Sequence, residues 1–188
     1  MKNQISAVFV TYEMIESALQ NIERLVISVP NSNIFLVDNS SPEYKKRKVY
    51  SDTIEQLPSR VTYLENSENS RFTAYNIALQ SIRSGRIIFR TDDDVFNESI
   101  TAKIVDKHWN GFATTHHKFN GQLQIKNDHR RPIETCIFDY DFLRTFLPFE
   151  NKPSADWKLL ERAFEKQEPA AFNDVILHKI GHGRELSA

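Results

Sequence analysis

Short apolar segments alternate with helix-like segments through the first ninety residues, and this alternation constrains the fold more than any other feature. ISAVFVTY (5–12), NIFLVD (33–38), RVTYLE (60–65) and RIIFR (86–90) are rich in the β-branched and aromatic residues typical of strands. Strands that alternate with helices predict an α/β fold, with a mostly parallel central sheet flanked by helices on both faces. Ligands of such sheets bind at the carboxyl ends of the strands.

The segments between these strands carry apolar residues at helical spacing. EMIESALQNIERLVISV (13–29), PEYKKRKVYSDTIEQL (42–57) and RFTAYNIALQSI (71–82) are therefore predicted as helices. KKRK (45–48) is interpreted as the solvated face of the second one.

The pattern changes in the second half of the chain. GFATTHHKF and QLQIKND flank Asn120-Gly121 and predict a small antiparallel hairpin over residues 111–128. A helix over 155–167 and a last strand over 170–178 follow. Because no linker, repeat or low-complexity tract interrupts the chain, we expect a single domain over residues 1–188.

Composition narrows the classes of function. Lys and Arg number 24 against 25 Asp and Glu, a formal net charge of -1, so no global field favours nucleic acid or other polyanions. Cys136 is the only cysteine, which excludes an internal disulfide framework and a cysteine-rich zinc site. With no signal peptide or membrane span in the sequence, we expect a soluble, cytoplasmic protein.

Three consecutive aspartates, Asp92, Asp93 and Asp94, follow the fourth predicted strand. Adjacent carboxylates repel one another unless a positive charge neutralises them, and Mg²⁺ or Mn²⁺ does so with oxygen ligands. Such a cation keeps positions for substrate phosphates, which indicates a nucleotide or another diphosphate. The alternative is an acidic turn that caps a helix beginning near Glu98.

Asp38 ends the second predicted strand at the same edge of a parallel sheet. In one interpretation it accepts hydrogen bonds from a nucleobase or ribose. In the other, Asp-Asn-Ser-Ser forms a turn and helix cap, with Pro42 in the first helical turn.

Six segments, in the order in which they occur along the chain, resemble family 2 glycosyltransferases of the GT-A fold. The resemblance covers most of residues 5–183. The six segments are VFVTYE, FLVDNSSPE, LENSENSRFTAYNIAL, IIFRTDDDV, PSADWKLLERA and VILHKIGH. The resemblance implies one GT-A-type domain whose residues 1–97 bind a nucleotide sugar and whose residues 98–188 form the acceptor half. It also implies transfer of the sugar, from a UDP-sugar by preference, to an acceptor hydroxyl with inversion.

The resemblance assigns roles to the strand-end carboxylates. Asp38 matches the residue that contacts the base, and Asp92, the first residue of the DxD motif, matches a contact to ribose or metal. Asp94 matches the ligand of the Mn²⁺ or Mg²⁺ ion between the two phosphates. Asp93 occupies the variable middle position and could share these roles.

Further substrate-binding residues follow from the same resemblance. Thr11 and Glu13 match the segment around the nucleoside, where the family often has asparagine in place of Glu13. Arg71 and Asn76 flank a loop-to-helix turn where amides and a guanidinium could meet phosphate. The family often has arginine directly before the asparagine, and this chain has Tyr75 there.

Two residues of the acceptor half complete the predicted site. Asp156 matches the general base, although Ala155 replaces the glutamate that usually precedes it; alternatively it is a favourable charge at a helix N-terminus. His178 matches a histidine that completes the metal shell and would favour manganese, with His182 as second choice. A histidine at a strand end is otherwise structural or exposed.

The acceptor itself is not specified by the sequence, nor is the oligomeric state. A lipid-linked saccharide, a polysaccharide end, a protein side chain or modified DNA all carry hydroxyl groups, although nucleic acid is disfavoured by the charge balance. His116, His117, His129, Arg130 and Arg131 could meet an anionic acceptor, or form a solvated face.

Two other functions remain open at this point. A sugar-phosphate nucleotidyltransferase also uses metal-bound carboxylates, but it usually has a glycine-rich loop after the first strand, and TYEMIES contains no glycine. A binding module could retain the nucleotide-sugar pocket without catalysis.

Overall fold

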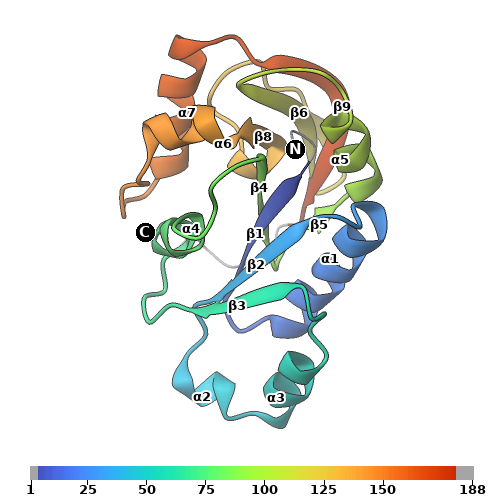
Figure 1. The fold of residues 1–188 in the computed structure, drawn as a ribbon, viewed down its shortest axis with the longest axis vertical. Coiled ribbons are helices and arrows are strands. Elements are labelled where there is room, and N and C mark those ends of the chain that lie inside the picture. The colour runs from blue at the N-terminus through green and yellow to red at the C-terminus, as the bar shows by residue number, and fades with distance from the viewer. Residues whose placement is uncertain (1–3, 181–188) are drawn as a thin grey trace.

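One mixed sheet organises residues 4–180, the part of the chain that the computed structural model describes (Figure 1). Its strands lie in the order β3-β2-β1-β4-β8-β6-β9-β5, and β7 pairs with β6. Their bounds are β1 (Ile5–Thr11), β2 (Asn33–Asp38), β3 (Val61–Glu65), β4 (Arg86–Thr91), β5 (Val95–Phe96), β6 (Phe112–Phe119), β7 (Gln122–Gln124), β8 (Cys136–Asp139) and β9 (Ala170–Lys179).

Helices cover both faces of this sheet. Helices α1, α3 and α5 contribute to one buried cluster, and α4, α6 and α7 contribute to the other. The helices are α1 (Ile15–Ser28), α2 (Pro42–Lys45), α3 (Lys48–Glu55), α4 (Arg71–Leu79), α5 (Glu98–Val105), α6 (Tyr140–Leu143) and α7 (Ala155–Lys166), with short 3-10 helices η1 (Ile133–Thr135) and η2 (Arg144–Phe146). The predicted α/β class is confirmed.

The first half of the sheet is parallel, and its strands end at one level. β1 pairs in parallel with β2 and β4, and β2 with β3. In this register Thr11 lies opposite Asp38, and Val10 opposite Thr91. The residues that follow β1, β2 and β4 therefore meet at one edge, as the strand-end rule requires.

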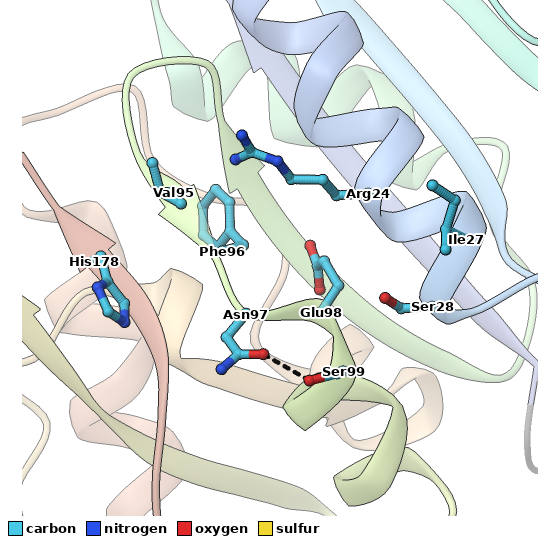
Figure 2. A pocket seen from close by; sticks show the side chains of 9 residues that line it. All are labelled: Arg24, Ile27, Ser28, Val95, Phe96, Asn97, Glu98, Ser99 and His178. Carbon is cyan, nitrogen blue, oxygen red and sulfur yellow. Dashed lines mark hydrogen bonds between the residues drawn. The ribbon is translucent and has the colours of Figure 1, made fainter.

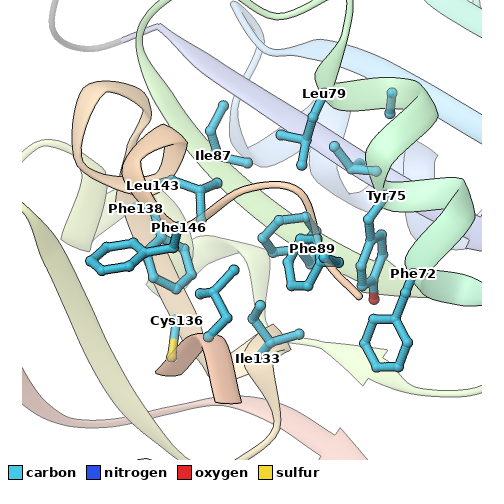
Figure 3. Close-up of a cluster of buried hydrophobic side chains, with 14 of the residues drawn as sticks. Phe72, Tyr75, Leu79, Ile87, Phe89, Ile133, Cys136, Phe138, Leu143 and Phe146 are labelled. Carbon is cyan, nitrogen blue, oxygen red and sulfur yellow. The ribbon is translucent and has the colours of Figure 1, made fainter. Parts of the chain in front are cut away.

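Side chains alternate between the two clusters along each strand. On β1, Val8 and Val10 face the α4 side, whereas Ala7 and Phe9 face the α1 side. Figure 3 shows the α4-side cluster, where aromatic rings from α4, β4 and β8 meet around Phe89. Strands buried on both faces read as continuous apolar runs, which is why the sequence revealed them.

The predicted hairpin is present as β6 and β7. Asn120 and Gly121 form its turn with φ of 47° and 80°. Both values are positive, as a tight two-residue hairpin turn requires, and this accounts for the Asn-Gly pair.

Two expectations about elements need correction. The single helix predicted over 42–57 is two helices, because Arg47 is extended (φ -73°, ψ 141°) between α2 and α3. This break lets Tyr44 and Tyr50 both reach the core. Strands β5 and β8 were not predicted, because two and four residues are too few to show a period.

Candidate active site

The loop after β4 is tied to the end of β1 through Asp92. Its Oδ2 accepts hydrogen bonds from the Thr11 hydroxyl at 2.8 Å and from the Tyr12 amide at 2.7 Å. Thr11 is fully buried. In this structure Thr11 therefore positions Asp92, and the two predicted site residues lie in direct contact.

Asp94 is buried and paired with a lysine that the sequence did not single out. Its Oδ2 accepts from the Lys179 ammonium at 2.9 Å and from the Thr91 hydroxyl at 3.2 Å. Burial raises the pKa of Asp94, and the Lys179 charge opposes that rise. Lys179 lies at the end of β9, so the last strand contributes a cation to the aspartate triplet.

The triplet does not cap α5, so the alternative reading of these aspartates is wrong. Asn97 is the N-cap residue of that helix, and its side chain makes no capping hydrogen bond. Glu98, in the first turn, instead forms a buried bidentate ion pair with Arg90 at 2.8 and 2.9 Å. Asp93, half-buried, raises the pKa of Asp94 by its charge.

Asp156 lies in the first turn of α7, 3% exposed, and pairs with Arg71. The guanidinium donates to its Oδ2 at 2.8 Å. Burial raises the pKa of Asp156, and the Arg71 charge lowers it. Two predicted residues from separate halves of the chain thus meet, although Arg71 was expected to contact phosphate.

Glu134, in η1, is a site residue that sequence reasoning missed. It is fully buried, and its Oε1 lies 3.6 Å from an Arg71 nitrogen and accepts from the Tyr75 hydroxyl at 3.2 Å. Its Oε2 has no hydrogen-bond partner among the described residues. The only local signal was a glutamate inside an otherwise apolar stretch, PIETCIF.

The charges at this edge suit an added cation. Within residues 4–180, four carboxylates act electrostatically on two cations, Arg71 and Lys179. The four are Asp93, Asp94, Glu134 and Asp156. In the described residues no three His, Cys, Asp or Glu side chains are grouped as metal ligands. A hard cation such as Mg²⁺ often takes only one or two protein carboxylates and leaves its other positions to water and phosphate, so the aspartates after β4 fit such an ion without a third protein ligand.

Asp38 is fully enclosed rather than open to a ligand. One carboxylate oxygen accepts from the Ser40 amide at 2.8 Å, and the other from the hydroxyls of Tyr50 and Tyr63 at 2.8 and 2.9 Å. The turn interpretation of this segment holds, although Ser41, not Asp38, caps α2. A contact between Asp38 and a base would require the two tyrosines to move.

Glu13 has a left-handed backbone, with φ of 58°. Its amide donates to the Ser40 hydroxyl at 2.8 Å, and its carboxylate accepts from the Ser41 hydroxyl at 2.5 Å. Asparagine tolerates this conformation better than most residues, which gives a conformational reason for the family's preference. Glu13 therefore connects the loops after β1 and β2.

Asn76 is occupied by a structural role. Its amide nitrogen donates to the Phe149 carbonyl and its oxygen accepts from the Phe149 amide, both at 2.9 Å. Both polar atoms of the Asn76 side chain are therefore engaged. The predicted contact with phosphate would require breaking one of these two hydrogen bonds.

His178 lies on β9, opposite Val95 of β5. It lines a pocket of about 420 Å³ with Arg24, Val95 and others, as Figure 2 shows. Successive strand residues point to opposite faces, and Lys179 takes the face toward Asp94. The structure brings Lys179 to Asp94, and the metal contact expected of His178 stays a prediction; His182 lies outside the described residues.

Of the basic cluster in the acceptor half, two residues are buried. Arg131 donates to the carbonyls of Asp128 and Thr115 at 2.9 and 3.2 Å, so it holds its own loop. Burial and the Lys179 charge lower the pKa of His117 to about 4, which leaves it neutral at pH 7. Neither residue is an exposed cation, so the hypothesis that they meet an anionic acceptor loses its basis.

Comparison with known proteins places these features in a family. The family model described as "Glycosyl transferase family 2" matches residues 6–172. No curated protein matches the chain. None of the described helices has the length and apolar character that crossing a membrane requires.

Solved structures share the fold at low sequence identity. Staphylococcus aureus TarS 1-349 in complex with UDP-GlcNAc matches with a TM-score of 0.77 and 16% identity, over 98% of this chain and 61% of that one. The mannosyltransferase PcManGT from Pyrobaculum calidifontis, in complex with GDP-Man and Mn²⁺, matches with a TM-score of 0.60 and 16% identity. This match covers 96% of this chain and 57% of that one. The chain thus spans about three fifths of these neighbours, and 36% of a longer TarS chain.

Proposed function

The chain belongs to glycosyl transferase family 2, and we propose on that premise that it transfers a sugar from a nucleotide diphosphate donor to an acceptor hydroxyl. One observation carries the proposal. The aspartates that follow β4 and the carboxylate of Asp156 on α7 lie in one charged cluster, linked through Arg71, Glu134 and Lys179. A donor diphosphate and an acceptor hydroxyl need these two kinds of group side by side.

We assign the donor to residues 1–97 and the acceptor to residues 98–188. UDP-sugar is the proposed donor, because similar structures hold UDP and UDP-GlcNAc; another holds GDP-Man. Asp92, with Thr11 beneath it, would face the ribose. Asp38 and Glu13 would shape the base-side loops, with Asp38 acting through Tyr50 and Tyr63 unless these move.

Asp94 and Asp92 would hold Mn²⁺ or Mg²⁺, and Mn²⁺ accompanies one structural neighbour. When bound, the ion neutralises charge on the leaving diphosphate. Asp93 lies beside these ligands and adds negative charge. The Thr91 hydroxyl donates to Asp94 at 3.2 Å and helps to hold this carboxylate in position.

Asp156 would act as the general base. It takes the proton of the acceptor hydroxyl as that oxygen bonds to the anomeric carbon, while the bond from this carbon to the diphosphate oxygen breaks. The nucleoside diphosphate leaves with the bonding electrons, and a single displacement inverts the centre. Arg71 holds the carboxylate in one orientation and favours its ionised form.

The acceptor class stays open among saccharides, lipid-linked saccharides and protein hydroxyls. Cys136 is a buried free thiol, which is compatible with the cytoplasmic location that we propose.

The test is a donor panel with purified protein and Mn²⁺. We expect release of nucleoside diphosphate from at least one UDP-sugar, by hydrolysis or by transfer to added saccharides. Asp156→Asn should lower this rate about 100-fold or more, the range typical of a general base. Asp141→Asn, at an exposed site on α6, is the matched control and should leave the rate unchanged.

Other results would contradict the proposal. Binding of UDP without turnover of any donor, together with no effect of Asp156→Asn, would indicate a binding module. Formation of pyrophosphate from nucleoside triphosphate and sugar phosphate would indicate a nucleotidyltransferase.

A further inference from the structure

Lys179 contacts the carboxylate that the proposed metal ion would need. Its ammonium lies 2.9 Å from Asp94 Oδ2, and the Asp94 side chain is almost fully buried while that of Lys179 is 31% exposed. A protonated amine and a divalent cation compete for the same carboxylate oxygen, because each requires its negative charge. The Asp94 carboxylate is thus already paired with a cation that belongs to the chain.

Two buried atoms near Lys179 lack partners. Glu134 Oε2 and His117 Nδ1 form no hydrogen bond with any of residues 4–180. Burial is the largest single influence and lowers the pKa of Lys179, but the charges of Glu134, Asp94 and Asp93 together outweigh it and raise the pKa. Lys179 in turn is the foremost charge lowering the pKa of His117. Lys179 therefore contacts Asp94 directly and also interacts electrostatically with Glu134, whose Oε2 is unsatisfied.

We propose that Lys179 is an internal counter-ion of Asp94 which a divalent cation must displace, and that Glu134 receives the displaced ammonium. The proposal rests on the metal site of the proposed function. A flexible four-carbon stem lets the lysine ammonium exchange partners without backbone motion. Displacement would also give Glu134 Oε2 the hydrogen bond that it lacks, which offsets part of the cost of breaking the pair with Asp94.

The first arm of the test measures Mn²⁺ binding alone, by electron paramagnetic resonance of free Mn²⁺, without donor or acceptor. Lys179→Met keeps the length of the side chain and removes its charge. It should bind Mn²⁺ at least about tenfold more tightly than the wild type, which corresponds to about 1.4 kcal/mol. Asp94→Asn should abolish the tight site. Lys118→Met, on the neighbouring strand β6, is the control for losing one lysine and should change the affinity little.

The second arm tests the receiving residue. Glu134→Gln should weaken Mn²⁺ binding in the wild-type background, because the displaced ammonium loses its new partner. In the Lys179→Met background, Glu134→Gln should have almost no effect, since there is no ammonium to receive. An equal effect in both backgrounds would mean that Glu134 acts only through its own charge, and would overturn its role as receiver.

The same measurements distinguish a wrong counter-ion role for Lys179 from a wrong metal site. If the wild type binds Mn²⁺ and a folded Lys179→Met or Lys179→Gln variant binds it no more tightly, the counter-ion role is wrong and the proposed metal site stands. If neither the wild type nor these variants binds Mn²⁺, metal dependence is wrong and the displacement falls with it. Circular dichroism of each variant establishes that it is folded.

Discussion

Arg71 is the residue on which the predicted base depends. It donates to Asp156 at 2.8 Å and lies 3.6 Å from Glu134, so one guanidinium serves two buried carboxylates. Because the two carboxylates repel each other, removal of the shared cation leaves both less favourable as anions. The role of Arg71 is therefore to keep Asp156 ionised and in place.

Arg71→Met should move the acid limb of the pH profile of kcat/KM to higher pH. The Arg71 charge lowers the pKa of Asp156, so its loss raises that pKa, and the base is then protonated over a wider range of pH. We expect a displacement of about one pH unit or more. The measurement is kcat/KM for the best donor from about pH 5 to about pH 9.

Arg71→Lys is the conservative partner of that variant. It retains a positive charge and should recover most of the position of the acid limb, though with less precise orientation of Asp156. An acid limb that stays in place in Arg71→Met would show that Arg71 does not set the ionisation of the base.

Local sequence segments pointed to some of the candidate site residues, whereas others reach the site only through long-range strand pairing. Asp92, Asp94 and Asp156 lie at strand or helix ends within recognisable segments, so local sequence was enough to single them out. Glu134 and Lys179 reach the site through the long-range pairings of β8 and β9. No local pattern reports such pairings, and for the same reason His178 was chosen over its neighbour Lys179.

At the scale of elements, Asn76 joins α4 to the segment that leads into α7. Its side chain makes a two-way hydrogen bond with the Phe149 backbone. The Phe149 ring packs beside Phe72 and Tyr75 of the same helix, with centroids 5.8 and 5.5 Å apart. This contact fixes the approach of α7, and with it the position of Asp156.

Asn76→Ala should therefore lower the free energy of unfolding by about 1–3 kcal/mol, because it leaves two backbone groups without partners. Urea unfolding measures the loss, and UDP affinity should change less than stability does. Gln80→Ala, an exposed residue at the end of the same helix, should cost less than about 0.5 kcal/mol. Unchanged stability together with weakened UDP binding would instead support the phosphate contact expected from the sequence.

For the molecule as a whole, the parallel half was predictable and the assembly of the second half was not. Continuous apolar runs identified β1 to β4, and their alternation with helices indicated a mostly parallel sheet. β6 pairs in parallel with β9 and antiparallel with β8, with irregular register between Thr114 and His117. Such pairings depend on packing between distant segments, which neither composition nor periodicity encodes.

Asp156 should make the whole molecule less stable as pH rises. Burial raises the pKa of Asp156 in the folded state, so the folded protein binds this proton more tightly than the unfolded chain does. The free energy of unfolding therefore falls as pH rises from the unfolded pKa of Asp156 to its higher folded pKa. Below the unfolded pKa this loss is absent. Asp156→Asn should be at least as stable as the wild type at pH 7, with the difference vanishing near pH 4.

Urea midpoints of the wild type and Asp156→Asn, measured at both pH values, check this expectation. Asp141→Asn, whose carboxylate is exposed, should show no such dependence. A variant that is less stable than the wild type at pH 7 would show that the pair with Arg71 outweighs burial.

The pairing of β5 with β9 also affects the chain as it leaves the ribosome. Val95 pairs with His178, and among the described strands β5 has no other neighbour. The parallel strands β1 to β4 are synthesised before β9, so Asp92 can form its contacts with Thr11 and Tyr12 before Lys179 is available to pair with Asp94. During synthesis the acidic loop is therefore held from its β1 side first, and Asp94 receives its lysine counter-charge only when β9 joins the sheet.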